Sequence, residues 1–478
     1  MPTEPCDLGA REARAMIGRK QLSPVELTQS CIARIAAIDP ALNAITAIDA
    51  DRALAAAKVA EAAVMAGEPL PLLHGLPIGV KDLEETAGLR STHGSLLFEH
   101  HIPVADDPMV ANLRAAGAVV LCKTNTPEFG AGAQTTNRIF GATGNPFDPA
   151  KTCSGSSGGS AVALATGMVL LGTGSDLGGS LRTPAAFCGV VGFRPSPGVV
   201  PDPLSTVALN PMPVLGPMGR TVDDAVLLLE AMVDFDRRDV FSSGDNLSLY
   251  SPIEPADLST IRVAISTDLG QCPIDTDIAK LFKARVKTFR HVFRSAEDRD
   301  PKMDGVHDTF ETLRALGFHA SFDGLLDTER ARLGPNVIAN TEAGRRLTVS
   351  QIARANIDQT RIYRDFLKLF EGADILISPA AAVSPFPKSQ LFVSEINGKT
   401  LPTYIHWVAI CYALTTALAT VACIPCGLDQ HGMPFGIQIA GPKGSDAKVL
   451  AVAKSLEAVL AADPETRRPV PDLRKLKR

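Results

Sequence analysis

The sequence has few aromatic residues, no surplus of positive charge and no disulfide framework. Its 478 residues include one Trp and four Tyr, and 52 Asp and Glu outnumber 47 Lys and Arg. The net charge of −5 offers no basic field to neutralise phosphates, so no nucleic acid is expected as a partner. Nine cysteines in a chain of this length predict free thiols and a cytoplasmic protein, because disulfides belong to oxidising compartments.

Long apolar runs and metal-binding spacings are also missing. The best candidate for a membrane span is the uncharged run 407–428, which holds three threonines and Pro425. We interpret it as a buried helix that leads into a buried strand, and we expect no membrane partner. The nine histidines show no HExxH spacing, and Cys423 and Cys426 lack the second half of a zinc site. Neither a metal nor another cofactor is predicted.

What the sequence does contain is an alternation of apolar strands with helices. Ser23 and Pro24 form a helix-start pattern, since Ser is a favoured N-cap and Pro a favoured first helical residue. Short apolar runs predict buried strands, and longer periodic segments predict helices. The strands are expected at 76–82, 118–122, 373–378 and 435–440, and the helices at 109–117, 221–233 and 448–461. This alternation favours a single α/β unit.

Residues 129–198 are rich in Gly, Ser, Thr, Asn and Pro, and three interpretations of them imply different chemistry. A phosphate loop would end in Gly-Lys-Ser/Thr or show GxGxxG, but Leu177 stands where the third Gly of that pattern belongs. A nucleophile elbow, GxSxG, would centre on Ser157. Such an elbow needs a later His, and neither His406 nor His431 lies in a recognisable context.

The third interpretation joins a serine nucleophile to a lysine base. A serine hydroxyl attacks poorly unless a base lies beside it, and a buried lysine can be that base if its pKa falls from about 10.4 to about 7–8. Lys81 suits this role because it ends the apolar run 76–80, and a second serine would carry the proton between the two. The run Leu177-Gly-Gly-Ser180 offers backbone N–H groups for an oxyanion. One such donor lowers the barrier by about 3–4 kcal/mol.

Three segments of the sequence resemble the motifs of the amidase signature family. They are Gly75-Leu-Pro-Ile-Gly-Val-Lys-Asp82, Gly155-Ser-Ser-Gly-Gly-Ser160 and Asp176-Leu-Gly-Gly-Ser-Leu-Arg-Thr-Pro-Ala185. These look like the family's lysine, first serine and nucleophile motifs, and Ser156 and Ser180 lie 24 residues apart, as the family's pattern requires. The resemblance implies a single-domain α/β fold in which helices cover both faces of a central mixed β-sheet.

The resemblance also assigns a role to each motif residue. Lys81 is the neutral base, Ser156 relays the proton and follows a cis peptide bond in the family, and Ser180 attacks the amide carbon. Water then cleaves the acyl-enzyme by the same route. The supporting residues are the oxyanion donors Leu177, Gly178, Gly179 and Ser180, the loop-fixing ion pair of Asp176 and Arg182, and Gly130, which faces the substrate and leaves a roomy acyl pocket.

The resemblance covers about residues 8–235 and 360–460, which we expect to form the core of one domain spanning 1–478. Residues 236–350 are expected to form a variable peripheral region. The basic segment 465–478 is expected to be a solvated tail, since chain ends fray where nothing holds them.

Two functions share this chemistry, and a third does without it. The first, which we favour, is a stand-alone amidase acting on a small carboxamide, anilide or carbamate-like substrate, with water as the second substrate and a homodimer left open. The second is the glutaminase subunit of a glutamyl-tRNA(Gln) amidotransferase, which needs a partner surface and an ammonia channel. The third is a catalytically silent binding scaffold, against which the intact Lys81, Ser156 and Ser180 argue.

Overall fold

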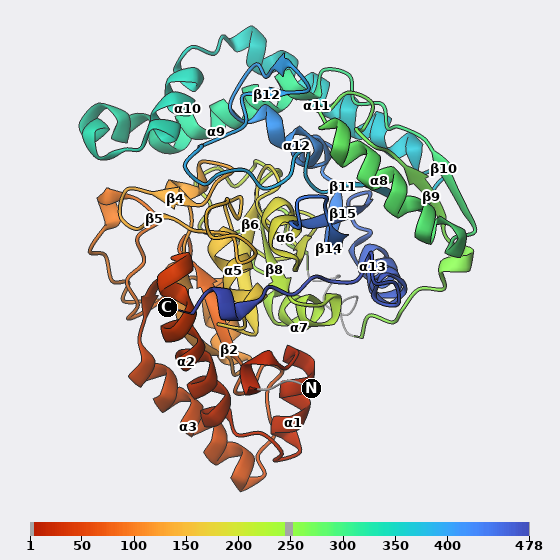
Figure 1. Cartoon of the computed structure of the whole chain (residues 1–478). Coiled ribbons are helices and arrows are strands. Elements are labelled where there is room, and N and C mark those ends of the chain that lie inside the picture. The colour runs from red at the N-terminus through yellow and green to blue at the C-terminus, as the bar shows by residue number, and fades with distance from the viewer. Residues whose placement is uncertain (1–3, 244–251, 478) are drawn as a thin grey trace.

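In the computed structural model, a mixed sheet of 11 strands runs through the centre of the molecule and helices flank it (Figure 1). The structure describes residues 4–243 and 252–477. The strand order is β1-β3-β2-β6-β8-β7-β14-β15-β11-β9-β10. Their bounds are Ile45–Ile48 (β1), Pro77–Lys81 (β2), Val119–Thr124 (β3), Leu171–Asp176 (β6), Val191–Arg194 (β7), Val214–Gly219 (β8), Arg262–Ile265 (β9), Ser295–Asp298 (β10), Ile375–Pro379 (β11), Thr420–Leu428 (β14) and Pro434–Gly441 (β15). The predicted α/β fold with a central mixed sheet is confirmed.

The middle of the sheet places two of the motifs side by side. β2 pairs in parallel with both β3 and β6, and β6 pairs antiparallel with β8. β2 and β3 are buried along their whole lengths, as short Ile- and Val-rich strands are when helices cover both faces. Because β2 and β6 are parallel, their carboxyl ends lie at the same edge of the sheet. Lys81 ends one strand and Asp176 ends the other, so the sheet brings these two motifs together.

The helices begin and end where local chemistry predicts. At α2, the Ser23 hydroxyl accepts hydrogen bonds from the first turn, and Glu26 closes a capping box. At α5, a Cβ on Gly159 would overlap the backbone nitrogen of Asn125, so glycine is required by the close approach of two chain segments. The helices of the first half and the last are α1 Ala10–Gly18, α2 Pro24–Leu42, α3 Ala50–Ala66, α4 Pro108–Ala115, α5 Gly158–Ala165, α6 Arg182–Cys188, α7 Val222–Met232 and α13 Asp446–Ala461.

The predicted strands and helices are confirmed, with ends that differ by at most two residues. The uncharged run 407–428 forms α12 (Ala409–Thr416) and then β14, which also confirms its interpretation as a buried helix followed by a buried strand. Among the described residues, no helix combines the length and apolar character that a membrane crossing requires.

The segment predicted to be peripheral contributes to both the sheet and a helical layer. Its strands β9 and β10 extend the sheet at one edge, where β9 pairs in parallel with β11. Its helices are α8 Thr276–Phe289, α9 Val306–Thr328 and α10 Pro335–Arg345, and α11 Val349–Leu369 follows them. Figure 1 shows α9, α10 and α11 at the opposite end of the molecule from α1, α2 and α3. Part of this segment therefore lies where it can shape the site described below.

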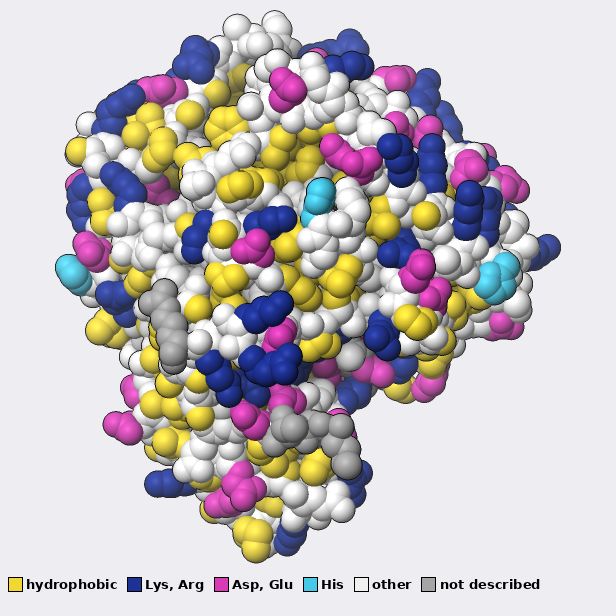
Figure 2. Space-filling view, viewed as in Figure 1, with side chains coloured by type: hydrophobic (Ala, Val, Ile, Leu, Met, Phe, Trp, Pro, Cys, Tyr) yellow, Lys and Arg dark blue, Asp and Glu magenta, His cyan; other side chains and the backbone are white. Residues whose placement is uncertain are grey.

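The basic C-terminal segment is folded against the body of the protein. Thr466 and Leu476 are buried, and Arg468 donates a hydrogen bond from Nε to the carbonyl of Gly189 at 2.9 Å. The expectation of a solvated tail is wrong for these residues, because apolar and small side chains between the charges find partners on the domain. Several of its charges are exposed, and Figure 2 shows Lys and Arg interspersed with Asp and Glu over the visible face.

Candidate active site

Lys81 lies at the carboxyl end of β2, with no part of the residue exposed to solvent. Its Nζ lies 2.7 Å from Ser156 Oγ, 2.9 Å from Ser157 Oγ and 2.8 Å from Ser175 Oγ. Its backbone N–H is held by Thr173 Oγ1 at 2.9 Å. Within the described part of the chain, three hydroxyls and no carboxylate contact the amine.

Burial sets the protonation of Lys81. Loss of solvation lowers the pKa of Lys81 from its usual 10.5 to about 8, because the charged ammonium is disfavoured away from water. The negative charges of Glu84 and Asp176 oppose this shift and are outweighed by it. Above about pH 8 the neutral amine prevails, and its lone pair can accept a proton.

The hydrogen bonds around Lys81 allow its lone pair to face Ser156. Ser157 Oγ accepts from the Ser175 N–H at 3.3 Å and donates its own hydrogen to the Ser175 carbonyl at 3.4 Å. Ser157 must therefore accept from Lys81. A neutral amine that donates to Ser157 and Ser175 has its lone pair free for the hydroxyl of Ser156. This geometry suits proton transfer from Ser156 to Lys81.

Ser156 and Ser180 lie in loops that meet beside Lys81. The peptide bond between Gly155 and Ser156 is cis, as the family resemblance implied. The Ser157 N–H donates to the Ser180 carbonyl at 3.2 Å and so ties the two loops together. Ser156 and Ser180 line the same cavity.

The structure brings Lys81 and Ser156 into direct contact, but it shows no hydrogen bond between Ser156 and Ser180. Among the described residues, the Ser180 hydroxyl has no partner within the protein. Catalytic hydrogen bonds are often long in the unliganded state and shorten when substrate binds. A hydroxyl that faces a cavity without a partner is free to attack a bound carbonyl.

The loop from Leu177 to Ser180 is fixed by the carboxylate of Asp176. Its Oδ1 accepts the Gly179 N–H at 2.9 Å, and its Oδ2 accepts the Leu181 N–H at 3.2 Å. The Gly179 N–H predicted to hold an oxyanion therefore already has an acceptor. The N–H groups of Leu177, Gly178 and Ser180 have no such acceptor in the described part of the chain, and for them the prediction stands.

Asp176 and Arg182 form the ion pair that the sequence predicted. Arg182 donates from Nε and Nη2 to the two carboxylate oxygens at 3.0 and 2.9 Å, and Arg194 Nη1 lies 3.4 Å from Oδ1. Burial would raise the pKa of Asp176, but the two guanidinium groups hold this pKa well below its usual range. The carboxylate therefore stays ionised and keeps the nucleophile loop in place.

The cavity has a volume of about 280 Å³ and is lined mainly by apolar side chains. Its charged lining residues, within the described chain, are Asp176 and Arg314, and Asp176 is already paired. Ser156, Ser180 and Gly178 form its reactive wall, and one face of α9 forms another wall. Apolar walls exclude water from the reacting atoms and suit a small, largely apolar substrate.

Gly130 lies against Ser156, the predicted proton relay. Its φ of +70° is a conformation that favours glycine, and a Cβ there would stand 3.5 Å from Ser156 Oγ and 3.3 Å from Leu83 Cδ1. The predicted position of Gly130 beside the substrate fits its place in the cavity wall. Its carbonyl accepts the Gly132 N–H at 3.0 Å.

We expect Gly130→Ala and Gly130→Leu to lower kcat/KM for large amides about tenfold more than for small ones, because the new side chain enters the cavity next to Ser156. Initial rates on matched small and large amides measure this. Gly67→Ala is the matched control, since Gly67 has a φ of +74° and no neighbour within 4 Å of its Cβ position. An unchanged size preference in the Gly130 variants would contradict the assignment.

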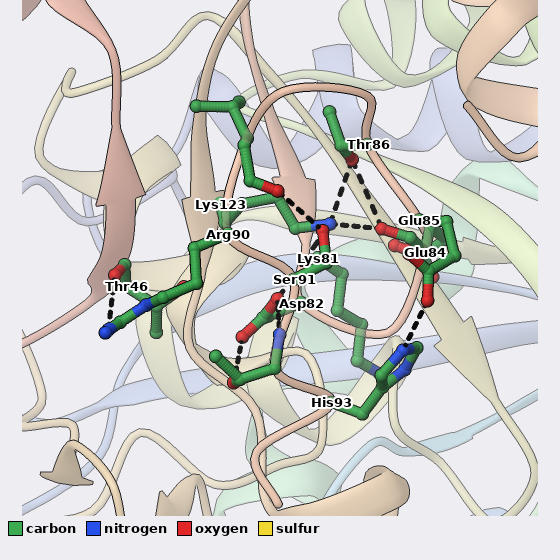
Figure 3. A network of polar contacts seen from close by, with 12 residues as sticks. Thr46, Lys81, Asp82, Glu84, Glu85, Thr86, Arg90, Ser91, His93 and Lys123 are labelled. Atoms are coloured by element: carbon green, nitrogen blue, oxygen red, sulfur yellow. Dashed lines mark hydrogen bonds and ion pairs between the residues drawn. The ribbon is translucent and has the colours of Figure 1, made fainter. Parts of the chain in front are cut away.

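Glu84 is a buried carboxylate near Lys81 that sequence reasoning did not single out. It is 3% exposed, its Oε2 accepts from Thr173 Oγ1 at 3.3 Å, and its Oε1 has no partner. Figure 3 shows it with Lys81 and Lys123 in one polar network, where Lys123 donates to the Glu84 carbonyl. Burial raises the pKa of Glu84 to about 7, against the opposing charges of Lys123 and Lys81.

We expect Glu84→Gln to move the acid limb of the pH–rate profile to lower pH, by about half a unit. The sign follows because an ionised Glu84 raises the pKa of Lys81, and removing that charge makes Lys81 easier to deprotonate. The measurement is kcat/KM between pH 5 and 10. Glu85→Gln is the control, because Glu85 bonds His93 and His101 and is not among the charges that shift the pKa of Lys81. A limb that moves to higher pH would contradict this account.

The alternative sequence interpretations lose support at this site. Ser157, the centre of the GxSxG pattern, contacts Lys81, while His406 bonds Thr403 and Glu311 and His431 is exposed. Ser175 was missed, although its place beside Asp176 in the nucleophile motif was a usable signal. The described residues include no group of three or more His, Cys, Asp or Glu arranged to hold a metal ion.

Comparison with known proteins identifies the family of the chain. Residues 26–450 match the protein family described as Amidase. The chain belongs to the amidase signature family. A bacterial aryl acylamidase of that family has a similar structure, with a TM-score of 0.87, 28% identity and coverage of 96% of both chains.

The sequence relatives of this amidase signature protein include both amidotransferase subunits and an acylamidase. It is 33% identical to a glutamyl-tRNA(Gln) amidotransferase subunit from Anaeromyxobacter dehalogenans, over 96% of this chain and 98% of the relative. It is 31% identical to an acylamidase of Rhodococcus erythropolis, over 95% of each chain. The family match runs from residue 26 to residue 450 and so includes the segment 236–350 that was predicted to be variable.

Proposed function

We propose that this enzyme hydrolyses the carbon–nitrogen bond of a small amide, such as a carboxamide, anilide or carbamate-like compound, through an acyl-enzyme on Ser180. The observation that carries the proposal is the 2.7 Å contact between Lys81 Nζ and Ser156 Oγ, in a buried site whose cavity also holds Ser180. A serine nucleophile needs such an activated base, and a lysine with a pKa of about 8 can act near neutral pH.

In the first half of the reaction, Lys81 accepts the Ser156 proton while Ser156 takes the proton of Ser180. Ser180 Oγ forms a bond to the amide carbon, and the carbonyl oxygen becomes an oxyanion. The unengaged N–H groups of Leu177, Gly178 and Ser180 stabilise that charge. The carbon–nitrogen bond then breaks, and the proton held by Lys81 returns through Ser156 to the leaving amine.

In the second half, water takes the place of the amine. Lys81 and Ser156 remove a proton from this water as its oxygen attacks the acyl carbon. The ester bond to Ser180 breaks, the proton returns to Ser180, and the carboxylic acid leaves. Both halves use one proton path, so a single lysine serves as base and then as acid.

A stand-alone amidase is favoured over the glutaminase subunit by the charges in the cavity. Glutamine carries an ammonium group beside its carboxylate, and this ammonium would need a free carboxylate in the cavity. Among the described lining residues, the one carboxylate is Asp176, which Arg182 and Arg194 engage. The structural similarity to an aryl acylamidase supports the same choice.

The proposal extends to the setting of the reaction. The nine cysteines are buried and unpaired, which supports the cytoplasm as the compartment. The amide substrate and water are the proposed partners, with no nucleic acid, membrane or cofactor, and a homodimer is compatible with the site.

The proposal is tested with the purified chain alone. The panel contains aliphatic amides, anilides, carbamates, glutamine and dipeptide amides, and release of amine or ammonia is measured. We expect turnover of anilides or simple amides without any added protein. Turnover restricted to glutamine, and dependent on a partner, would support the glutaminase subunit instead. A fluorophosphonate that fails to label Ser180, with no turnover of any amide, would support the silent scaffold.

A further inference from the structure

Arg314 is a buried cation in the wall of the cavity. It lies on α9, is 7% exposed and lines the same cavity as Ser180. Its guanidinium carbon lies 4.7 Å from the centre of the Phe318 ring and 5.5 Å from that of Tyr404. Aromatic faces and apolar neighbours therefore surround a charge in a site of low polarity.

Neutral groups of the protein accept hydrogen bonds from some of the N–H donors of this guanidinium. Nη1 donates to Asn340 Oδ1, and Nη2 donates to the Tyr404 hydroxyl at 2.7 Å. These bonds use two of the five N–H donors that a guanidinium carries. In the described part of the chain, no Asp or Glu oxygen lies within ion-pair distance of Arg314, whereas Arg182 and Arg194 share the Asp176 carboxylate.

A buried charge without a counterion in contact is unfavourable. Such a group is normally paired, because loss of solvation costs several kcal/mol per ion. Glu311 acts on Arg314 from beyond ion-pair distance, and its own Oε1 accepts from Thr403 at 2.6 Å. The cavity next to Arg314 is where a counterion can enter, and the polar partners Asn340 and Tyr404 hold the guanidinium in a fixed orientation. The missing partner of Arg314 is then a group on the ligand.

The position of Arg314 along α9 says which part of a substrate it meets. A Cβ on Gly178, in the oxyanion loop, would lie 3.2 Å from Phe310, and Phe310 precedes Arg314 by one helical turn, or about 6 Å of helix. Ser156, whose neighbour Ser157 bonds the Ser180 carbonyl, delivers the proton to the leaving amine in the proposed mechanism. The leaving amine therefore faces Ser156, and the acyl group extends from the oxyanion loop towards Phe310 and Arg314.

We infer that the enzyme takes amides whose acyl group ends in a carboxylate, and that Arg314 binds this carboxylate. This inference rests on the proposed amidase function and adds the class of substrate. The three unused N–H donors suit a carboxylate, which accepts two parallel hydrogen bonds from a guanidinium. The apolar side chains beside Arg314 strengthen such a pair because they exclude water.

The test compares substrates that differ only in the terminal charge. The probes are the mono-p-nitroanilides of succinic and glutaric acid, each set against the p-nitroanilide of the unbranched monoacid of the same length, butyric or valeric acid. We expect kcat/KM of the wild-type enzyme to favour at least one diacid derivative by about tenfold or more. N-acetyl derivatives of aminobenzoic acid place the carboxylate on the leaving group, and these should gain no such advantage.

Variants at Arg314 then assign the preference to this residue. Arg314→Met is expected to lower kcat/KM about 10- to 100-fold for the preferred diacid derivative, and less than threefold for its neutral counterpart. Arg314→Lys should keep part of the preference, because it retains the charge but not the fork of donors. Arg354→Met is the matched control, since the Arg354 side chain is 72% exposed on α11 and should change neither substrate class.

The outcomes separate this inference from the proposed function. If no p-nitroanilide of either class is turned over, the amidase proposal itself fails. If neutral and diacid derivatives are turned over equally, or if the leaving-group carboxylates are preferred, the inference about Arg314 is overturned and the amidase proposal survives. Should the Arg314 variants fail to fold, inhibition of the wild-type enzyme decides: glutarate or succinate must inhibit more strongly than valerate or butyrate, and equal inhibition overturns the inference.

Discussion

Replacing Ser180 by alanine is expected to lower kcat by about 10⁴- to 10⁶-fold, the range seen when a serine nucleophile is removed from a working site. The change deletes the atom that bonds to the acyl carbon. It should leave the fold intact, because the Ser180 hydroxyl has no partner among the described residues, so no hydrogen bond is lost. The measurement is the initial rate on an anilide that the wild-type enzyme turns over, together with the thermal midpoint of both proteins.

The control for Ser180 is Ser259→Ala, because Ser259 is an exposed serine outside the cavity. This variant should keep the wild-type rate, and a fluorophosphonate should label it as fully as it labels the wild-type enzyme. Activity of Ser180→Ala within tenfold of wild type would remove Ser180 from the mechanism, and labelling of Ser157 in its place would revive the nucleophile elbow.

The second large effect is expected at Lys81. Lys81→Met should lower kcat about 10³- to 10⁴-fold, since it removes the base while an unbranched apolar side chain fills the buried space. Lys81→Ala should be nearly inactive as well. The wild-type rate should be half-maximal near pH 8 and fall about tenfold per pH unit below it, because the working form of Lys81 is the neutral one and acid protonates it.

Lys123 provides the matched control for this prediction. It is a second fully buried lysine whose pKa is also lowered by burial, but its Nζ bonds the Glu84 carbonyl and Thr86 and contacts none of the site serines. Lys123→Met should therefore retain an acid limb of the same slope, moved to lower pH at most as far as in Glu84→Gln, because loss of the Lys123 charge raises the pKa of Glu84. A wild-type profile that stays flat down to pH 5 would rule out a lysine base, whatever the rate of the Lys81 variants.

The sequence predicted the strands from local patterns, and the family resemblance implied that Lys81 and Ser156 lie together. Apolar runs of five or six residues marked β2 and β3, and the buried end of β2 pointed to Lys81 as a desolvated base. The spacing of Ser156 and Ser180 directed attention away from Ser157. The parallel pairing of β2 with β6 brings Ser175 to Lys81, whereas Ser156 reaches Lys81 from the loop that precedes α5.

The rest of the site depends on contacts that sequence order does not reveal. Whether the Gly179 N–H faces an oxyanion or Asp176 is decided by the orientation of one carboxylate. Arg314 and Phe310 lie more than 100 residues from the nucleophile, on a helix in a segment with no recognisable motif. The burial of Leu476 likewise depends on where the end of the chain returns to the domain, which its composition did not indicate.

In the proposed function, helix α9 separates selection of the substrate from the chemistry. The side chains that it gives to the cavity recur along one face of the helix, and α9 also packs against α10 and α11. Lys81 and Asp176 lie at the ends of β2 and β6, which are separated from α9 by many other elements of the chain. Directed evolution could therefore randomise this one face to obtain new acyl preferences, while the proton path stays untouched. The positions to vary are Phe310, Arg314, Gly317, Phe318, Ser321 and Phe322.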